Sequence, residues 1–265
     1  MIAPVLKFPG AKWNLAAWIT AHMPAHRAYV EPFFGSGAVF FRKRPAKVEV
    51  INDLDGRVVN LFRVIRERPE ELVRAVEMTP WSREEYRLSY ELSDEPVEDA
   101  RRLLVRSWQA HAHKCGEGSG WRRDLSGRRG ASCVSDWRVL PARLLASVER
   151  LKDAHIENRP APDVIADFAS SPDALIYCDP PYLIPAAARY YRHAMTLADH
   201  EEMLHALRAH SSMVMLSGYD HALYDELLSD WRRLSTASRA EKGRRREEVL
   251  WLNPAAAEAL DGRLF

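Results

Sequence analysis

The beginning of the chain switches between two hydrophobic periods, and this switching constrains the fold more than any other feature of the sequence. The expected elements are a strand, a helix, a second strand and a second helix, at residues 28–31, 38–42, 47–51 and 54–65. Two glycines, Gly35 and Gly37, follow the first strand, and the second helix stops before Pro69. This order predicts the start of a doubly wound α/β sheet.

The α/β pattern is interrupted in the middle of the chain and then resumes. Residues 67–152 predict mainly helices, with a stretch rich in Gly, Ser and Arg from Cys115 to Cys133. Strands and helices then alternate again at residues 155–158, 163–168, 174–178, 199–210, 213–216 and 220–228, and end in a hairpin at 231–236 and 248–252. We therefore expect a catalytic domain formed by residues 1–66 and 153–265, with a mostly helical inserted domain at residues 67–152.

Composition places the chain among cytoplasmic proteins. It has 265 residues, of which 47% are hydrophobic, enough for one large domain or a domain with an insert. No run approaches the roughly 20 apolar residues of a membrane span, and residues 1–12 do not resemble a secretory signal. The three cysteines at positions 115, 133 and 178 are widely spaced, which argues against a disulfide framework and favours a reducing compartment.

The net charge of +1 hides two basic clusters. Residues 101–130 hold eight Lys and Arg against two acidic residues, and residues 239–246 hold five against one. Such clusters on a nearly neutral chain indicate a local surface for a polyanion, although solvated surface residues explain charge alone equally well. The candidate DNA contacts in the first cluster are Lys114, Arg122, Arg123, Arg128 and Arg129.

The strongest chemical signal is Asp179-Pro180-Pro181-Tyr182, directly after an apolar strand. Ligands of an α/β sheet bind beyond the carboxyl ends of its strands, and two consecutive prolines stiffen this loop. The Asp179 carboxylate and the Pro180 carbonyl then form a pair of acceptors for both hydrogens of an exocyclic amino group. Tyr182 offers a flat face to an extruded base. The alternative is a rigid turn in which Asp179 caps and Tyr182 packs.

A second motif, Glu31-Pro32-Phe33-Phe34-Gly35-Ser36-Gly37, joins the first strand to the next element. Its glycines let a ligand approach the backbone, yet their spacing is neither that of a dinucleotide fold nor that of a phosphate loop. This points to a smaller adenosine-bearing ligand. Asp53 follows the second strand, where an acid accepts hydrogen bonds from ribose hydroxyls; a helix cap before Leu54 is the alternative role.

The apolar and aromatic segment from Leu6 to Trp13 is the third element, and we expect it to pack over the site or to cover the sheet edge as a terminal strand. Together, Phe8 and Lys12, the glycine motif, Asp53 and Asp179 to Tyr182 resemble, in this order, the Dam-like family of DNA adenine methylases. The resemblance covers the whole chain. One departure is Phe8, since Trp or Tyr is also common there and a phenyl ring cannot form a hydrogen bond.

The resemblance implies a Rossmann-like methyltransferase sheet, S-adenosylmethionine as methyl donor and an insert that reads double-stranded DNA. It also implies that Phe8, Lys12 and Asp53 contact the cofactor. The full expected cofactor set is Phe8, Lys12, Glu31, Phe33, Gly35, Gly37, Asp53 and Asp179. The family's occurrence in bacteria and phages makes a role in restriction-modification a further expectation, with no obligatory protein partner.

We expect direct methyl transfer to the N6 amino group of a flipped adenine, without a covalent intermediate. Cys178 does not follow a proline, as the nucleophile of cytosine C5 methylases does. The rival substrates are the cytosine N4 amino group, RNA adenine and protein glutamine; the rival class is a catalytically silent DNA- or cofactor-binding module. We expect no metal, although His111, His113 and Cys115 are residue types that zinc accepts.

Overall fold

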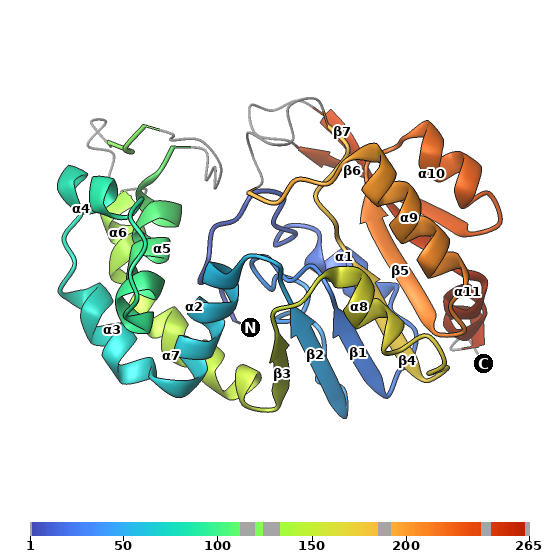
Figure 1. Ribbon diagram of the computed structural model, residues 1–265, viewed down its shortest axis with the longest axis horizontal. Coiled ribbons are helices and arrows are strands. Elements are labelled where there is room, and N and C mark those ends of the chain that lie inside the picture. Colours follow the sequence, from blue (N-terminus) through green and yellow to red (C-terminus); the bar gives the residue numbers. More distant parts are fainter. Residues whose placement is uncertain (1, 112–119, 124–132, 185–191, 240–244, 263–265) are drawn as a thin grey trace.

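The computed structural model describes residues 2–111, 120–123, 133–184, 192–239 and 245–262 (Figure 1). The predicted DNA contacts Lys114, Arg128 and Arg129 lie outside these ranges, as do the zinc-ligand types His113 and Cys115. None of the helices in these ranges is long and apolar enough to cross a membrane.

The described strands form a seven-stranded sheet in the order β3-β2-β1-β4-β5-β7-β6. Strands β1 to β5 run parallel, whereas β7 is antiparallel to both β5 and β6. The bounds are β1 Ala28–Glu31, β2 Val48–Asn52, β3 Ala154–Glu157, β4 Ala174–Cys178, β5 Met213–Gly218, β6 Arg232–Arg239 and β7 Arg245–Leu252. Each predicted strand is present, and the hairpin is β6 and β7.

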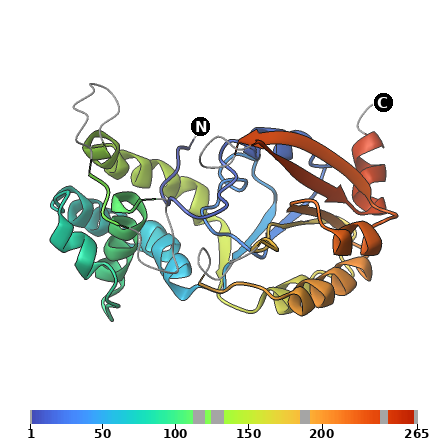
Figure 2. The ribbon, with the colours of Figure 1, turned by 90° about the horizontal axis from the view of Figure 1, so that it is seen from above.

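The central strands are buried on both faces, which explains their continuous apolar runs. One face of β4, with Leu175 and Tyr177, joins the core under α1 (Ala16–Ala21) and α11 (Pro254–Asp261). The opposite face, with Ile176 and Cys178, packs under three other helices: α8 Ala161–Ala166, α9 Leu197–Arg208 and α10 Ala222–Leu227. Figure 2 shows these two layers on either side of the sheet.

Five helices gather beside the β3 edge of the sheet (Figure 1). This helical group consists of α3 Pro69–Glu77, α4 Arg83–Leu88, α5 Pro96–Gln109, α6 Cys133–Arg138 and α7 Leu140–Lys152. It packs on α2 (Gly56–Glu67), and apolar residues of the sheet, of α2 and of the helical group share one core. A buried ion pair, Arg57 Nε to Asp99 Oδ1 at 3.0 Å, joins α2 to α5.

Two predicted helical features are wrong. Residues 38–42 form turns rather than a helix; two bonds of helical type, Phe41 N to Gly37 O and Lys43 N to Val39 O, are made before Pro45 prevents continuation. Leu54 is not on the apolar face of a helix but is 51% exposed in a loop, and α2 begins at Gly56. The short helices α1, α4, α6 and α11 were not individually predicted.

Candidate active site

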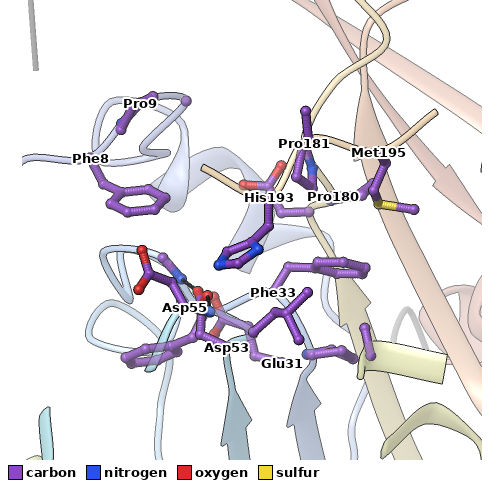
Figure 3. A pocket seen from close by; sticks show the side chains of 18 of the residues that line it. Phe8, Pro9, Glu31, Phe33, Asp53, Asp55, Pro180, Pro181, His193 and Met195 are labelled. Carbon is purple, nitrogen blue, oxygen red and sulfur yellow. Dashed lines mark hydrogen bonds between the residues drawn. The ribbon is translucent and has the colours of Figure 1, made fainter. Parts of the chain in front are cut away.

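The predicted motifs meet at a cavity between β1 and β4, where the order in which successive strands join the sheet reverses. β1 leads to β2 on one side and β3 leads to β4 on the other, so the carboxyl ends of β1 and β4 open the sheet at its switch point. A cavity of about 550 Å³ opens there. It is lined by Phe8, Lys12, Glu31, Phe33, Gly35, Asp53, Asp179, Pro180 and Pro181 (Figure 3).

The two glycines of the loop after β1 have different tasks. Gly35 has φ +50° and lines the cavity, and a side chain there would begin 3.1 Å from the Phe8 ring. Gly37 has φ +66°, but its Cα faces the core: a Cβ would lie 2.5 Å from Phe34 and 2.9 Å from Phe41. Both positions require glycine. Only Gly35 borders the space that a ligand would occupy.

Asp53 is tied to this glycine loop. Its Oδ2 accepts a hydrogen bond from the Gly35 amide at 2.8 Å, and its Oδ1 accepts one from the Asp55 amide at 2.8 Å. Burial raises the pKa of Asp53 to about 6. The cap of α2 is Asp55, whose Oδ1 accepts from the Arg57 amide, so the alternative role of Asp53 as a helix cap is wrong.

Glu31 is the last residue of β1, and its side chain is buried beside the cavity. The Tyr29 hydroxyl donates to Glu31 Oε2 at 2.8 Å. The pKa of Glu31 is raised to about 8, mainly by burial, and the charge of nearby Asp179 acts in the same direction. Burial therefore favours the protonated form of this carboxyl group, and a further positive charge bound beside it would favour the ionised form.

The N-terminal segment brings Lys12 to the loop after β4. Lys12 Nζ lies 2.9 Å from Asp179 Oδ1 and donates to Gly10 O at 2.6 Å. The segment is a loop that lines the cavity, so the alternative of a terminal strand at the sheet edge is wrong. The same Oδ1 also accepts a hydrogen bond from Ser217 Oγ, on β5, at 2.9 Å.

The proline pair after Asp179 is held from behind by α9. His200 Nε2 lies 3.0 Å from Pro181 O, and Tyr224 Oη lies 2.7 Å from His200 Nδ1. A carbonyl can only accept, so Nε2 carries the proton and Nδ1 accepts from the tyrosine. Burial lowers the pKa of His200, which keeps the ring neutral in this arrangement.

Tyr182 lies beside the cavity rather than in its lining. Its side chain is buried, and its hydroxyl donates to Glu248 Oε2 on β7 at 3.1 Å. Lys12 Nζ lies 4.5 Å from the centre of its ring, and the Tyr219 ring meets it edge-on at 4.6 Å. These contacts fix the plane of the ring next to Asp179.

The predicted DNA contacts Arg122 and Arg123 follow directly after Trp121, which pairs with Ala110 at the end of α5. The Arg122 amide donates to Gln109 O at 2.8 Å, and Trp81 Nε1 donates to Arg122 O at 3.0 Å. The backbone is thus fixed, while Arg123 is exposed. In the described part of the chain no group of three His, Cys, Asp or Glu residues could hold a metal ion.

Several residues of the site lie outside the three predicted motifs. The cavity is also lined by Asp55, residues 160–162 after β3, and residues 192–195; Figure 3 shows His193 in the middle of the labelled residues and Met195 beside Pro180 and Pro181. Arg192 pairs with Asp55 at 3.4 Å. Ser217 and His200 stand on elements distant in sequence, and no local signal marks either residue.

The sheet order and the cavity at its switch point confirm the predicted doubly wound α/β sheet. Residues 8–247 match the family described as D12 class N6 adenine-specific DNA methyltransferase, and the chain belongs to this family. It is therefore an enzyme that methylates the N6 amino group of adenine in DNA, as the motifs predicted.

The curated relatives of this chain are also methyltransferases by name. A DNA adenine methylase of Serratia marcescens is 26% identical over 248 residues, which is 85% of each chain. A DNA adenine methylase of Escherichia coli (strain K12) is 26% identical over 242 residues, 83% of this chain and 82% of the relative. A Type II methyltransferase of Lactococcus lactis subsp. cremoris is 36% identical over 97 residues, 35% of this chain and 33% of the relative. The prediction of a restriction-modification role fits the last name.

Proposed function

We propose that this enzyme takes its methyl group from S-adenosylmethionine and passes it directly to an adenine turned out of double-stranded DNA. The observation that carries the proposal is the single cavity shared by Asp179, Pro180, Glu31 and Asp53. One end of the cavity suits a cationic nucleoside, and the other offers acceptors to an amino group. We place this activity in the cytoplasm, without an obligatory protein partner.

The donor set of the cavity fits S-adenosylmethionine. Asp53 holds two backbone hydrogen bonds and has acceptor capacity left for ribose hydroxyls. Glu31 places a buried carboxyl where the cationic amino acid part of the cofactor would favour its ionised form. Phe8 and Phe33 supply apolar surface. When bound, the cofactor supplies a methyl group that its sulfonium charge makes electrophilic.

The acceptor pair accounts for the activation of adenine. The adenine amino lone pair is delocalised into the ring and is a poor nucleophile. Asp179 and the Pro180 carbonyl would each accept a hydrogen bond from one of the two amino hydrogens. These bonds would hold the N–H groups out of the plane of the adenine ring, so that the nitrogen lone pair points toward the methyl group. The neighbouring Pro181 carbonyl already accepts from His200, which leaves Pro180 for the substrate. The protein thereby supplies position, and no residue forms a bond to the base.

We propose that the flipped adenine stacks on Tyr182, whose ring plane is already fixed by Glu248 and Tyr219. The helical group would read the target sequence, since Arg122 and Arg123 stand on a backbone anchored to α5. Arginine side chains bind phosphates and base edges, and double-stranded DNA presents both to a protein surface.

The direct test is expression in a host that lacks DNA methylation, followed by sequencing with detection of modified bases. We expect N6-methyladenine at one short sequence motif, and none with Asp179→Ala. If the product is N4-methylcytosine, or if methylation is found only in RNA, the substrate is not adenine in DNA and the proposal is wrong on this point. Binding of DNA and cofactor without any methylated product would make the chain a silent module.

A further inference from the structure

The two oxygens of the Asp179 carboxylate have different surroundings. Oδ1 is contacted by both Lys12 Nζ and Ser217 Oγ, each at 2.9 Å. Among the residues that the structure describes, no hydrogen bond reaches Oδ2. Because Asp179 lines the cavity, Oδ2 is the oxygen left to accept a hydrogen from the adenine amino group.

The hydrogen bonds behind Oδ1 run in one direction. Ser217 Oγ has two acceptors in reach, Asp179 Oδ1 at 2.9 Å and Cys178 O at 3.4 Å, and its single proton favours the shorter bond to the charged carboxylate. Tyr177 Oη lies 2.9 Å from Ser217 Oγ and must then be the donor to that oxygen. Burial raises the pKa of Tyr177 well above its ordinary value, so this proton stays on the tyrosine. The order is Tyr177 to Ser217 to Asp179.

The sheet fixes this row of donors. In the parallel pair of β4 and β5, Tyr177 lies opposite Met215 and Cys178 lies opposite Leu216, so Ser217 follows at the level of Asp179. Alternate residues of a strand share a face, which puts Ser217 on the side of Tyr177. Lys12, in contrast, reaches Oδ1 from a loop on a long side chain. The flexible Lys12 side chain balances the charge of the Asp179 carboxylate, whereas the Ser217 hydroxyl on a central strand fixes the orientation of that carboxylate.

We propose that Ser217, supported by Tyr177, is a positioning residue that turns the Asp179 carboxylate so that Oδ2 faces the amino group of the target adenine. The inference rests on the proposed role of Asp179 as an acceptor in the transfer step. Ser217 does not line the cavity, so its loss should change the transfer step and leave binding of DNA and cofactor unchanged.

The test compares Ser217→Ala, Ser217→Thr and Tyr177→Phe with the wild-type enzyme at saturating DNA and cofactor. We expect Ser217→Ala to lower kcat about 10- to 100-fold, the scale of one hydrogen bond to a charged group, with KM for DNA and cofactor affinity unchanged. Ser217→Thr keeps the hydroxyl and restores most of kcat. Tyr177→Phe leaves the serine donor in place and lowers kcat only about 2- to 5-fold, since it removes the hydrogen bond to Ser217 and no direct contact with Asp179.

Ser212→Ala is the matched control. Ser212 is fully buried just before β5, and its hydroxyl donates to Phe168 O, far along the strand from Asp179. Its loss removes a buried hydrogen bond on the same segment, so Tm should fall as in Ser217→Ala while kcat stays unchanged. Equal kcat in Ser212→Ala and Ser217→Ala, or no recovery in a folded Ser217→Thr, overturns the positioning role.

A double-mutant cycle separates this inference from the proposed function. If Ser217 acts only through Asp179, adding Ser217→Ala to Asp179→Ala lowers kcat no further. If Asp179→Ala abolishes turnover while Ser217→Ala keeps wild-type kcat, the positioning role fails and the acceptor role of Asp179 stands. If both single variants keep wild-type turnover, the proposed acceptor mechanism itself fails.

Discussion

Lys12 and Asp179 form a nearly buried ion pair, with Nζ 2.9 Å from Oδ1 and the two side chains 5% and 18% exposed. Each member compensates the charge of the other where both side chains are largely shielded from solvent. The removal of one partner therefore has two separable effects, a chemical effect on the transfer step and a structural cost from the charge left behind.

The first prediction is that Asp179→Ala lowers methylation turnover by orders of magnitude and leaves DNA affinity nearly unchanged, because the lost acceptor acts on the reacting amino group. Stability should fall by up to about 3 kcal/mol, since Lys12 is left unpaired. The double variant Lys12→Met with Asp179→Ala should regain stability but not turnover. Near wild-type methylation by Asp179→Ala contradicts the mechanism.

The second prediction concerns Asp53. Asp53→Ala should weaken binding of S-adenosylmethionine by about 1–3 kcal/mol, the usual cost of a lost hydrogen bond to a charged group. Asp55 continues to cap α2, so the helix should keep its stability. Calorimetric titration of the variant measures the affinity, and an unchanged value would remove Asp53 from the cofactor site.

The third prediction is a dependence of stability on pH that traces to Glu31. Burial raises its pKa to about 8, above the ordinary value of about 4.3, so the folded protein holds this proton more tightly than the unfolded chain. The free energy of unfolding therefore falls as pH rises from about 4 to about 8, by up to about 1.4 kcal/mol per pH unit. Denaturant unfolding of the ligand-free protein at pH 6.5 and pH 7.5 measures the slope.

Glu31→Gln is the matched variant for this prediction. The amide keeps an acceptor for the Tyr29 hydroxyl but cannot ionise, so the variant should lose most of the slope between the two pH values. An equal slope in both proteins assigns the effect to another group.

The fourth prediction concerns Arg122 and Arg123, which lie between α5 and α6 in the chain. If Arg122 and Arg123 each touch a phosphate, replacing both with Ala should reduce the salt slope of DNA binding by about two, one unit per contact. An arginine that reads a guanine edge would instead relax sequence preference by about 1–3 kcal/mol at one position. Titrations of a cognate and a scrambled duplex at two salt concentrations distinguish these outcomes, and no change in either leaves both arginines as solvated surface.

The fifth prediction tests the packing task of Gly37. Gly37→Ala should destabilise the protein by about 1–3 kcal/mol, because the new methyl group meets Phe34 and Phe41 and the backbone has φ +66°. Cofactor affinity should change little once folding is corrected for, since Gly37 does not line the cavity. A thermal scan and a titration on the same sample give both values.

The sequence predicted the sheet and its motifs well for a physical reason. The residues of β1, β4 and β5 are mostly apolar and buried, and the glycine motif and the Asp179 loop follow β1 and β4, whose carboxyl ends open at the switch point. Asp53 and Asp179 could thus be placed from their position after a strand. Leu54 could not, because an apolar residue in a cavity-lining loop looks the same in sequence as one on a helix face.

The residues behind the motifs could not be found in this way. Ser217 meets Asp179 only because β5 pairs with β4 in one register, and His200 meets Pro181 only because α9 crosses behind the loop. Both relationships are set by packing over long sequence separations. The second contact of Lys12, with Asp179, depends likewise on where the N-terminal loop folds back.

The position of α2 limits how this enzyme can be re-engineered. One side of the helix completes the core of the sheet, and Arg57 on the same helix holds Asp99 of α5. The helical group is therefore not a cassette that could be exchanged between relatives by cutting at residue 67. A chimaera that exchanges the helical group has to carry α2 along with the helices it supports, and the loop that holds Asp53 and Asp55 would have to accept the new helix at its first turn.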